Sequence, residues 1–147
     1  MNQATIEKRF EEYLRKNQLK LTPQRVRIFE KAFETHEHFS AEKLYEWLRQ
    51  EDGPKVSRAT VYRTLDMLER GGFIESLDVG RGELVYEHVL GHKHHDHLVC
   101  TECGRIEEFQ DERIERLQEE NARKKGFVLK DHVLRLMGLC ADCQQST

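Results

Sequence analysis

The sequence predicts an α+β fold in two parts: a helical part that ends in a β-hairpin, and a smaller part that combines short strands with one helix. Helix-start signals recur through the first half, and glycine-containing turns delimit short strands after residue 71. All four cysteines and six of the eight histidines lie in residues 86–147, so the two halves also differ in chemistry. We therefore expect one domain over 1–86 and a second over 87–147.

The first half contains four segments with helical signals. Residues 3–17 carry apolar side chains at helical spacing. The other three segments begin after Thr22, Ser40 and Ser57, whose hydroxyls can cap a first turn. In each of them an apolar residue before the cap can pack against the fourth residue of the helix. The helices that follow Ser40 and Ser57, joined by a turn at 52–54, predict a helix-turn-helix.

The helix that begins at Ser57 is followed by a hairpin. Val61 and Leu65 fall on its buried side at helical spacing, so Tyr62 and Arg63 project elsewhere. Two glycines at 71–72 end the helix, and residues 73–87 have the pattern of two strands around a turn. Helices followed by a hairpin form a winged helix, in which the second helix of the helix-turn-helix normally enters the major groove of DNA.

The charge distribution supports a nucleic-acid partner only locally. The net charge of -3 taken alone disfavours one. Between Glu12 and Glu30, however, five basic residues and no acidic residue occur, and residues 53–65 are acid-free with three basic residues. Such basic stripes suit a surface that faces phosphates, although a solvated helix face is the alternative.

The cysteines form two CxxC pairs, Cys100 with Cys103 and Cys140 with Cys143. This spacing lets one turn of backbone present two thiolates to a tetrahedral ion. It favours one structural zinc over a disulfide, which a reducing compartment disfavours, and over thioredoxin-like redox chemistry, which needs a βαβ context. Because 36 residues separate the pairs, the ion would join the start of the second part to its end.

A histidine-rich segment precedes the first CxxC pair. If residues 94–99 form a strand, His95 and His97 point to one face and His94 and Asp96 to the other. One strand could therefore supply two metal sites, and a solvated histidine run is the alternative. Downstream we expect a strand at 104–109, a helix capped by Asp111 that ends near Gly126, and a strand over 127–139.

In combination these motifs resemble the ferric uptake regulator (Fur) family over nearly the whole chain. The implied protein is a homodimeric, metal-sensing transcriptional regulator whose winged helix binds double-stranded operator DNA and whose second domain dimerises. A metal at the hinge would select the DNA-binding arrangement. The resemblance rests on three motifs: Leu21-Thr22-Pro23-Gln24-Arg25, Ala59-Thr60-Val61-Tyr62-Arg63-Thr64-Leu65, and His94-His95-Asp96-His97-Leu98-Val99-Cys100-Thr101-Glu102-Cys103-Gly104.

The resemblance implies specific site residues. The regulatory hinge site would use His38, Glu87, His95, His97 and Glu108. A further metal site would use His94, Asp96, Glu115 and His132. The DNA-binding residues would be Lys20, Arg25, Ser57, Thr60, Tyr62 and Arg63. The segment 87–95 is one residue longer than the family pattern, which leaves open whether Glu87 or the pair His88 and His92 completes the hinge site.

The ligand types favour iron as the regulatory metal. Peroxide-sensing relatives place Asp where this chain has Glu108, and zinc-sensing relatives use a Cys in the hinge site, whereas the CxxC pairs already claim all four cysteines here. We expect an Fe(II)-responsive repressor of metal-uptake genes, in which Mn(II), Co(II) or Zn(II) can substitute. Sensing of manganese, zinc or peroxide is the alternative within the family.

Two alternatives from other classes remain. A small metallohydrolase would need an open coordination position, a general base and a substrate pocket; the sequence offers no nucleophile constellation, so we expect no enzyme. A DNA-binding scaffold with purely structural metals would keep the winged helix without sensing. The chain has no apolar run long enough to span a bilayer and no signal peptide, so we expect a cytoplasmic protein without a membrane partner. The sequence leaves open a pairing of dimers on DNA.

Overall fold

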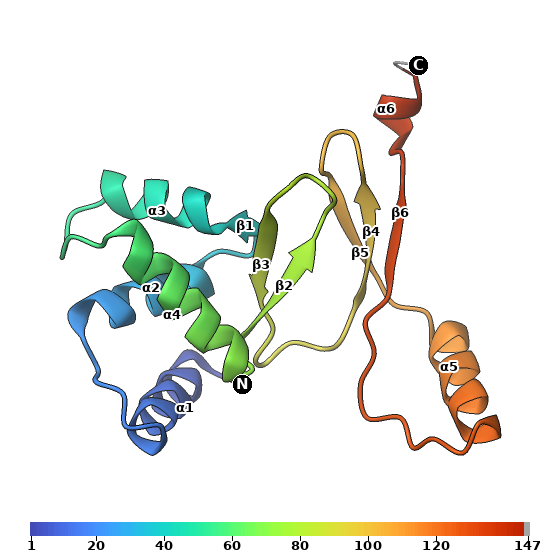
Figure 1. The fold of residues 1–147 in the computed structure, drawn as a ribbon, viewed down its shortest axis with the longest axis horizontal. Helices are drawn as coiled ribbons and strands as arrows, with labels where there is room; N and C mark the ends of the chain where they lie inside the picture. Colours follow the sequence, from blue (N-terminus) through green and yellow to red (C-terminus); the bar gives the residue numbers. More distant parts are fainter. Residues whose placement is uncertain (146–147) are drawn as a thin grey trace. The chain divides into compact units, whose positions relative to one another are not determined.

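The computed structural model describes residues 1–145, which divide into two compact units (Figure 1). Unit 1 comprises residues Met1–Lys93, and unit 2 begins at His94. No helix within the described range combines the length and hydropathy needed to cross a bilayer.

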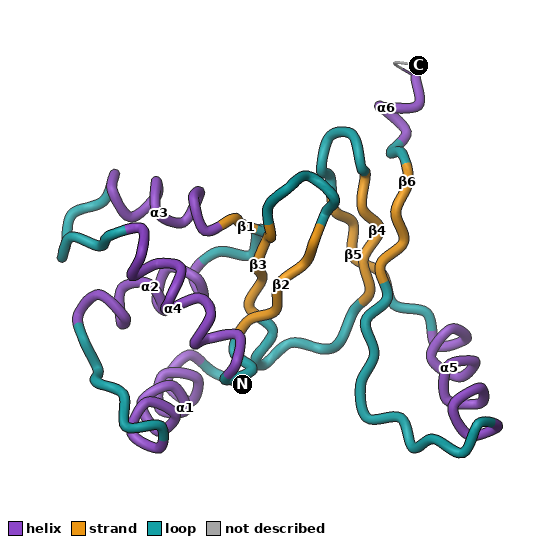
Figure 2. Tube along the Cα trace, in the orientation of Figure 1, coloured by secondary structure: helices purple, strands orange, loops and turns teal. Residues whose placement is uncertain are grey.

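Unit 1 consists of four helices and a small antiparallel sheet. Figure 2 shows the hairpin of β2 and β3 following α4 directly along the chain. The strand order is β1-β3-β2. The elements are α1 (Gln3–Lys16), α2 (Pro23–Glu34), β1 (Phe39–Ser40), α3 (Ala41–Gln50), α4 (Arg58–Arg70), β2 (Ile74–Asp78) and β3 (Leu84–His88).

The predicted helix caps are confirmed. The hydroxyls of Thr22 and Ser40 accept hydrogen bonds from backbone N–H groups three residues later, at 3.2 and 3.1 Å. The Ser57 hydroxyl does the same at 3.2 Å. Phe39 and Leu44, which flank the second cap, are both buried, as a hydrophobic staple requires. These local interactions fix where α2, α3 and α4 begin.

The core of unit 1 fixes which side of α4 faces outward. Phe10 stacks on Phe29 with ring centroids 4.3 Å apart, and Phe73, just before β2, packs edge-on against Phe29. Leu65 of α4 is fully buried in the same cluster. Burying side chains of this size contributes about 1.5–3 kcal/mol each. Tyr62 of the same helix lies outside this cluster and is 49% exposed.

Unit 2 is a three-stranded sheet with two helices. Strand β4 lies at the centre, antiparallel to β5 and parallel to β6. Among its described residues, Val99 and Cys100 are the buried apolar ones, so the unit has a small core. The elements are β4 (Asp96–Cys100), β5 (Ile106–Phe109), α5 (Glu112–Lys124), β6 (Arg135–Gly138) and α6 (Ala141–Gln145).

The predicted α+β fold with an N-terminal winged helix is confirmed, and one strand is shorter than expected. The strand predicted over 127–139 extends only over Arg135–Gly138, and residues 127–134 have no regular structure. The reason lies in its partner: β6 pairs with β4 from His97 to Cys100, and β4 is only five residues long. The Leu134 carbonyl still accepts a hydrogen bond from His97 N at 3.2 Å, but among the described residues no strand pairs with 127–133.

Candidate metal centres and nucleic-acid interface

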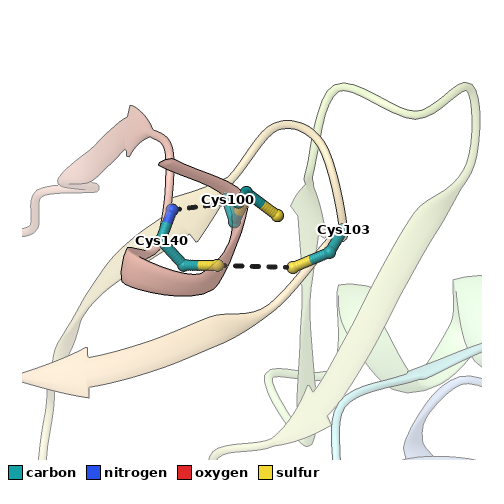
Figure 3. A group of neighbouring side chains, drawn as sticks. Cys100, Cys103 and Cys140 are labelled. Atoms are coloured by element: carbon teal, nitrogen blue, oxygen red, sulfur yellow. Dashed lines mark hydrogen bonds between the residues drawn. The ribbon is translucent and has the colours of Figure 1, made fainter. Parts of the chain in front are cut away.

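The four cysteines come together at one end of unit 2. Figure 3 shows Cys100 and Cys103 opposite Cys140, which lies just before α6. The sulfur atoms of Cys103 and Cys140 are 3.8 Å apart, and the sulfur atoms of all four cysteines lie within 4.8 Å of one another. A tetrahedral zinc with Zn–S bonds of 2.3 Å requires S–S distances of about 3.8 Å. The predicted set therefore fits a closed four-thiolate zinc site.

Backbone amides support the charged form of Cys100. The N–H groups of Cys103 and Cys140 donate towards its sulfur, with Cys140 N at 3.4 Å, and they lower the pKa of Cys100 to about 6. Hydrogen bonds with Cys140 and Cys100 raise the pKa of Cys143 instead. The thiolate is the form that binds metal, so the backbone amides around Cys100 favour it as a ligand.

The predicted further site is also assembled within unit 2. His94 lies just before β4 and Asp96 is the first residue of β4. Glu115 lies on α5, and His132 lies in the segment before β6. One oxygen of Asp96 lies 3.1 Å from His94 Nε2 and 3.2 Å from His132 Nε2. The Glu115 carboxylate lies 3.5 Å from the same nitrogen of His132.

The environment of Asp96 fits a cation. Its side chain is buried, and its other oxygen, Oδ2, has no hydrogen-bond partner among the described residues. A buried carboxylate needs a compensating charge, which a divalent ion bound by two imidazoles and two carboxylates would supply. Such a nitrogen and oxygen set suits Zn, Fe, Mn or Co.

Unit 2 also positions its part of the predicted hinge site. The rings of His95 and His97 lie 4.9 Å apart, and His95 Nε2 is 3.3 Å from a Glu108 oxygen. His97 is the register partner of Glu108 in the pairing of β4 with β5. The alternation predicted for residues 94–97 is therefore present, because His94 and Asp96 form a different cluster.

Unit 1 positions the other two predicted hinge residues as a pair. His38 Nε2 lies 2.8 Å from a Glu87 oxygen, and both side chains are largely buried. The sheet register explains this contact: Phe39 pairs with Tyr86 in an antiparallel ladder, so His38 lies opposite Glu87.

Glu87 and the substitutes that the sequence left open have different neighbours within unit 1. His88, the next residue along β3, contacts the Ala32 carbonyl and His92. Burial lowers the pKa of His88. Together with His36 these two histidines form a third cluster, which the sequence analysis did not predict. The only available signal was the i, i+4 spacing of His88 and His92 around a glycine.

Four of the six predicted DNA-binding residues line a groove on unit 1: Arg25, Ser57, Thr60 and Arg63. The groove has a volume of about 960 Å³ and extends along α4 from its cap to Arg70. At the start of the helix, Ser57 and Thr60 share a 2.9 Å hydroxyl contact. Tyr62 is exposed but is not a lining residue of this groove, and its hydroxyl lies 3.3 Å from Glu42. The basic residues that line the groove are Arg25, Lys55, Arg63 and Arg70.

Some basic residues of the acid-free windows have structural roles. The Arg27 guanidinium donates to the carbonyls of Leu48 and Glu51 at 2.7 and 3.0 Å, which ties α2 to the turn after α3. Arg25 donates to the Lys20 carbonyl at 2.6 Å and so holds the loop before α2. The Lys20 and Arg63 side chains are exposed, as a phosphate-facing surface requires.

Comparison with known proteins identifies the family. The model of the Ferric uptake regulator family matches residues 16–137. The chain belongs to the ferric uptake regulator family. It is 41% identical over 133 residues to the Ferric uptake regulation protein of Neisseria meningitidis serogroup A, covering 89% of this chain and 90% of that protein. The resemblance inferred from the motifs is thus confirmed, and the chain is a metal-responsive regulator of this family.

Solved structures agree with this assignment. The Helicobacter pylori ferric uptake regulator Fur, described as having three functional metal binding sites, is 33% identical with a TM-score of 0.87, covering 98% of this chain and 95% of that one. A zinc uptake regulator complexed with zinc and DNA is 29% identical with a TM-score of 0.59, covering 98% of this chain and 95% of that one.

Proposed function

We propose that the chain is an Fe(II)-responsive regulator that acts mainly as a repressor of metal-uptake genes. Residues 1–86 would bind operator DNA, and residues 87–147 would bind metal and dimerise. The observation that carries the proposal is that each unit contains a close pair of predicted metal ligands. These pairs are His38 with Glu87 in unit 1 and His95 with Glu108 in unit 2. An ion that uses both pairs would couple metal availability to the arrangement of the DNA-binding unit.

The metal assignment follows from ligand chemistry. We propose zinc for the four thiolates, because soft sulfur ligands in tetrahedral geometry favour it. For the regulatory ion we propose iron, because imidazoles and carboxylates suit Fe(II); Mn(II), Co(II) and Zn(II) can substitute in such a site. The set around Asp96 would hold a further ion of the same kind.

A homodimer is proposed through unit 2. Several large apolar side chains of this unit are exposed, including Phe127 at 71%, Val128 at 88% and Val133 at 84%. Exposed apolar surface of this extent marks an interaction surface, and a second copy of the chain would cover it. Two copies would also present two winged helices to a pseudo-palindromic operator.

Substitution of Arg63 or Lys20 by alanine is expected to weaken operator binding. The Arg63 guanidinium can bond guanine or phosphate in the major groove, where Tyr62 can pack against thymine methyls. Lys20 can enter an A·T-rich minor groove, whose narrowness deepens the negative potential. For Arg63→Ala we expect a loss of about 1–3 kcal/mol, or about 5- to 150-fold, by fluorescence anisotropy at moderate salt.

A matched control for this series is Arg123→Ala on α5, which removes one positive charge from an exposed helix of unit 2. Its operator affinity should stay close to that of the wild type. If Arg63→Ala and Lys20→Ala bind operator as tightly as Arg123→Ala does, the DNA-binding face lies elsewhere.

The proposed function is tested by measuring operator affinity with and without Fe(II) while zinc stays in the four-thiolate site. We expect Fe(II) to increase the affinity strongly, because the ion stabilises the arrangement that fits DNA. Equal affinity in both conditions would contradict sensing and leave a DNA-binding scaffold with structural metals.

A further inference from the structure

We infer that unit 1 carries a metal site of its own, formed by the imidazoles of His36, His88 and His92, for a divalent ion such as Zn²⁺. Each residue offers one ring nitrogen, and these nitrogens lie within 4.8 Å of one another. All three belong to residues 1–93. The site shares no residue with the four thiolates or with the set around Asp96, and the sequence offered His88 and His92 only as alternatives to Glu87 in the hinge site.

The backbone after β3 brings His92 back to His88. The N–H groups of Val89 and Leu90 donate to the Phe73 carbonyl at 3.1 and 3.4 Å, and His92 N donates to the Val89 carbonyl at 3.0 Å. Gly91 completes this turn at φ 89°, in the region that favours glycine. The two Nε2 atoms are consequently 2.9 Å apart.

The His88 ring is oriented as metal-binding histidines usually are. Its Nδ1 lies 3.1 Å from the Ala32 carbonyl oxygen, which can only accept, so Nδ1 carries the proton and donates. This tautomer leaves a lone pair on Nε2, the atom that faces His92. The ring also stacks on Phe33 at 5.0 Å between centroids. A hydrogen bond from the second ring nitrogen to a carbonyl is the usual outer-shell support of a metal ligand.

His36 completes the cluster from the loop between α2 and β1. Its ring lies 5.3 Å from that of His88 and 6.2 Å from that of His92. The loop is held by a 3.1 Å hydrogen bond from Glu37 N to the Thr35 hydroxyl. His36 and His92 are exposed whereas His88 is nearly buried, so water can reach the open side and supply a fourth ligand.

The ligand set differs in chemistry from the other histidine sites. It contains three imidazoles and no carboxylate, whereas the set around Asp96 contains two carboxylates. Imidazoles suit Zn²⁺, Cu²⁺ and Ni²⁺ better than they suit Mn²⁺. Zn–N bonds of 2.0–2.1 Å in a tetrahedron place nitrogens about 3.3 Å apart. The exposed rings of His36 and His92 can reach this spacing by small side-chain movements.

An ion bound here would tie the end of β3 to the loop after α2. His88 and His92 bracket the turn that leads to Lys93, the last residue of unit 1, and His36 lies two residues before the predicted hinge ligand His38. Binding would therefore stiffen both segments within unit 1. This site does not depend on DNA binding or on the identity of the regulatory metal.

The test compares Zn²⁺ stoichiometry in full-length wild type and in a His36→Ala, His92→Ala double variant, by equilibrium dialysis and metal analysis. Both positions are exposed, so the core is left intact. We expect the double variant to bind one Zn²⁺ fewer per chain and to keep its four-thiolate zinc. The matched control is Glu37→Ala, Lys93→Ala, which replaces an exposed neighbour of each histidine and should bind as much Zn²⁺ as the wild type. Equal stoichiometry in the double variant and the control overturns the proposal.

A second measurement uses the wild-type chain and needs no variant to fold. Long-range ¹H–¹⁵N NMR of the imidazole side chains, followed during Zn²⁺ addition, should show the resonances of His36, His88 and His92 shifting together at one further equivalent. If these resonances stay unchanged after the other sites are filled, the three rings form only a hydrogen-bonded cluster and the site does not exist.

Discussion

A Cys140→Ser variant is expected to lose its zinc and, with it, the folded state of unit 2. Cys140 follows β6 and Cys100 ends β4, so the ion would clamp the ends of two parallel strands. Few apolar side chains are buried in this unit to hold those strands together without it. Structural zinc sites of this type contribute apparent binding energies of about 10 kcal/mol, which exceed what a small core supplies.

Metal analysis, circular dichroism and sedimentation measure this effect. The variant should contain one zinc fewer per chain than the wild type, and its second unit should lose its folded structure and its dimer contacts. Ala141→Ser serves as a matched control, since it adds a hydroxyl beside the site and removes no ligand. A Cys140→Ser protein that is dimeric and holds full zinc would show that the four thiolates are not a structural site.

The parts of the fold that depend on local interactions could be predicted from the sequence. The starts of α2, α3 and α4 follow from Thr22, Ser40 and Ser57, because a cap acts within one turn of its helix. The two faces of the strand at 94–97 follow from the period of a strand. Proximity of the two CxxC pairs followed from the chemistry of thiolates, although 36 residues separate them.

The parts that depend on pairing between distant segments could not be predicted. The length of β6 is set by its partner β4, and β1 has only two residues, too few for any periodicity. The position of Glu87 opposite His38 is a consequence of sheet register, which motif spacing does not specify. His36 is distant from His88 and His92 in the sequence, and the fold brings the three together. The spacing of His88 and His92 was therefore the only sequence signal for this cluster.

A His95→Ala, His97→Ala variant is expected to lose the increase in operator binding that Fe(II) or Mn(II) produces in the wild type. Under the proposed switch, His38 and Glu87 bind the ion from unit 1, and His95, His97 and Glu108 bind it from unit 2. One ion can satisfy both sets only in a restricted range of relative orientations. An ion that binds this arrangement about 100-fold more tightly than others biases it by about 2.7 kcal/mol.

Removal of two imidazoles eliminates most of that differential affinity without touching the DNA-binding surface. The measurement is operator affinity with and without Fe(II) or Mn(II) in a protein verified to retain its four-thiolate zinc and dimeric state. The matched control is a His94→Ala, His132→Ala variant, which removes the same number of imidazoles from the neighbouring cluster and should still respond to metal. His94, just before β4, and Asp96 in β4 belong to one cluster, whereas His97 in β4 points to the other face, so the two double variants separate the two sites. A full metal response in the His95→Ala, His97→Ala protein, together with loss of the response in the control, would place the switch at the cluster around Asp96.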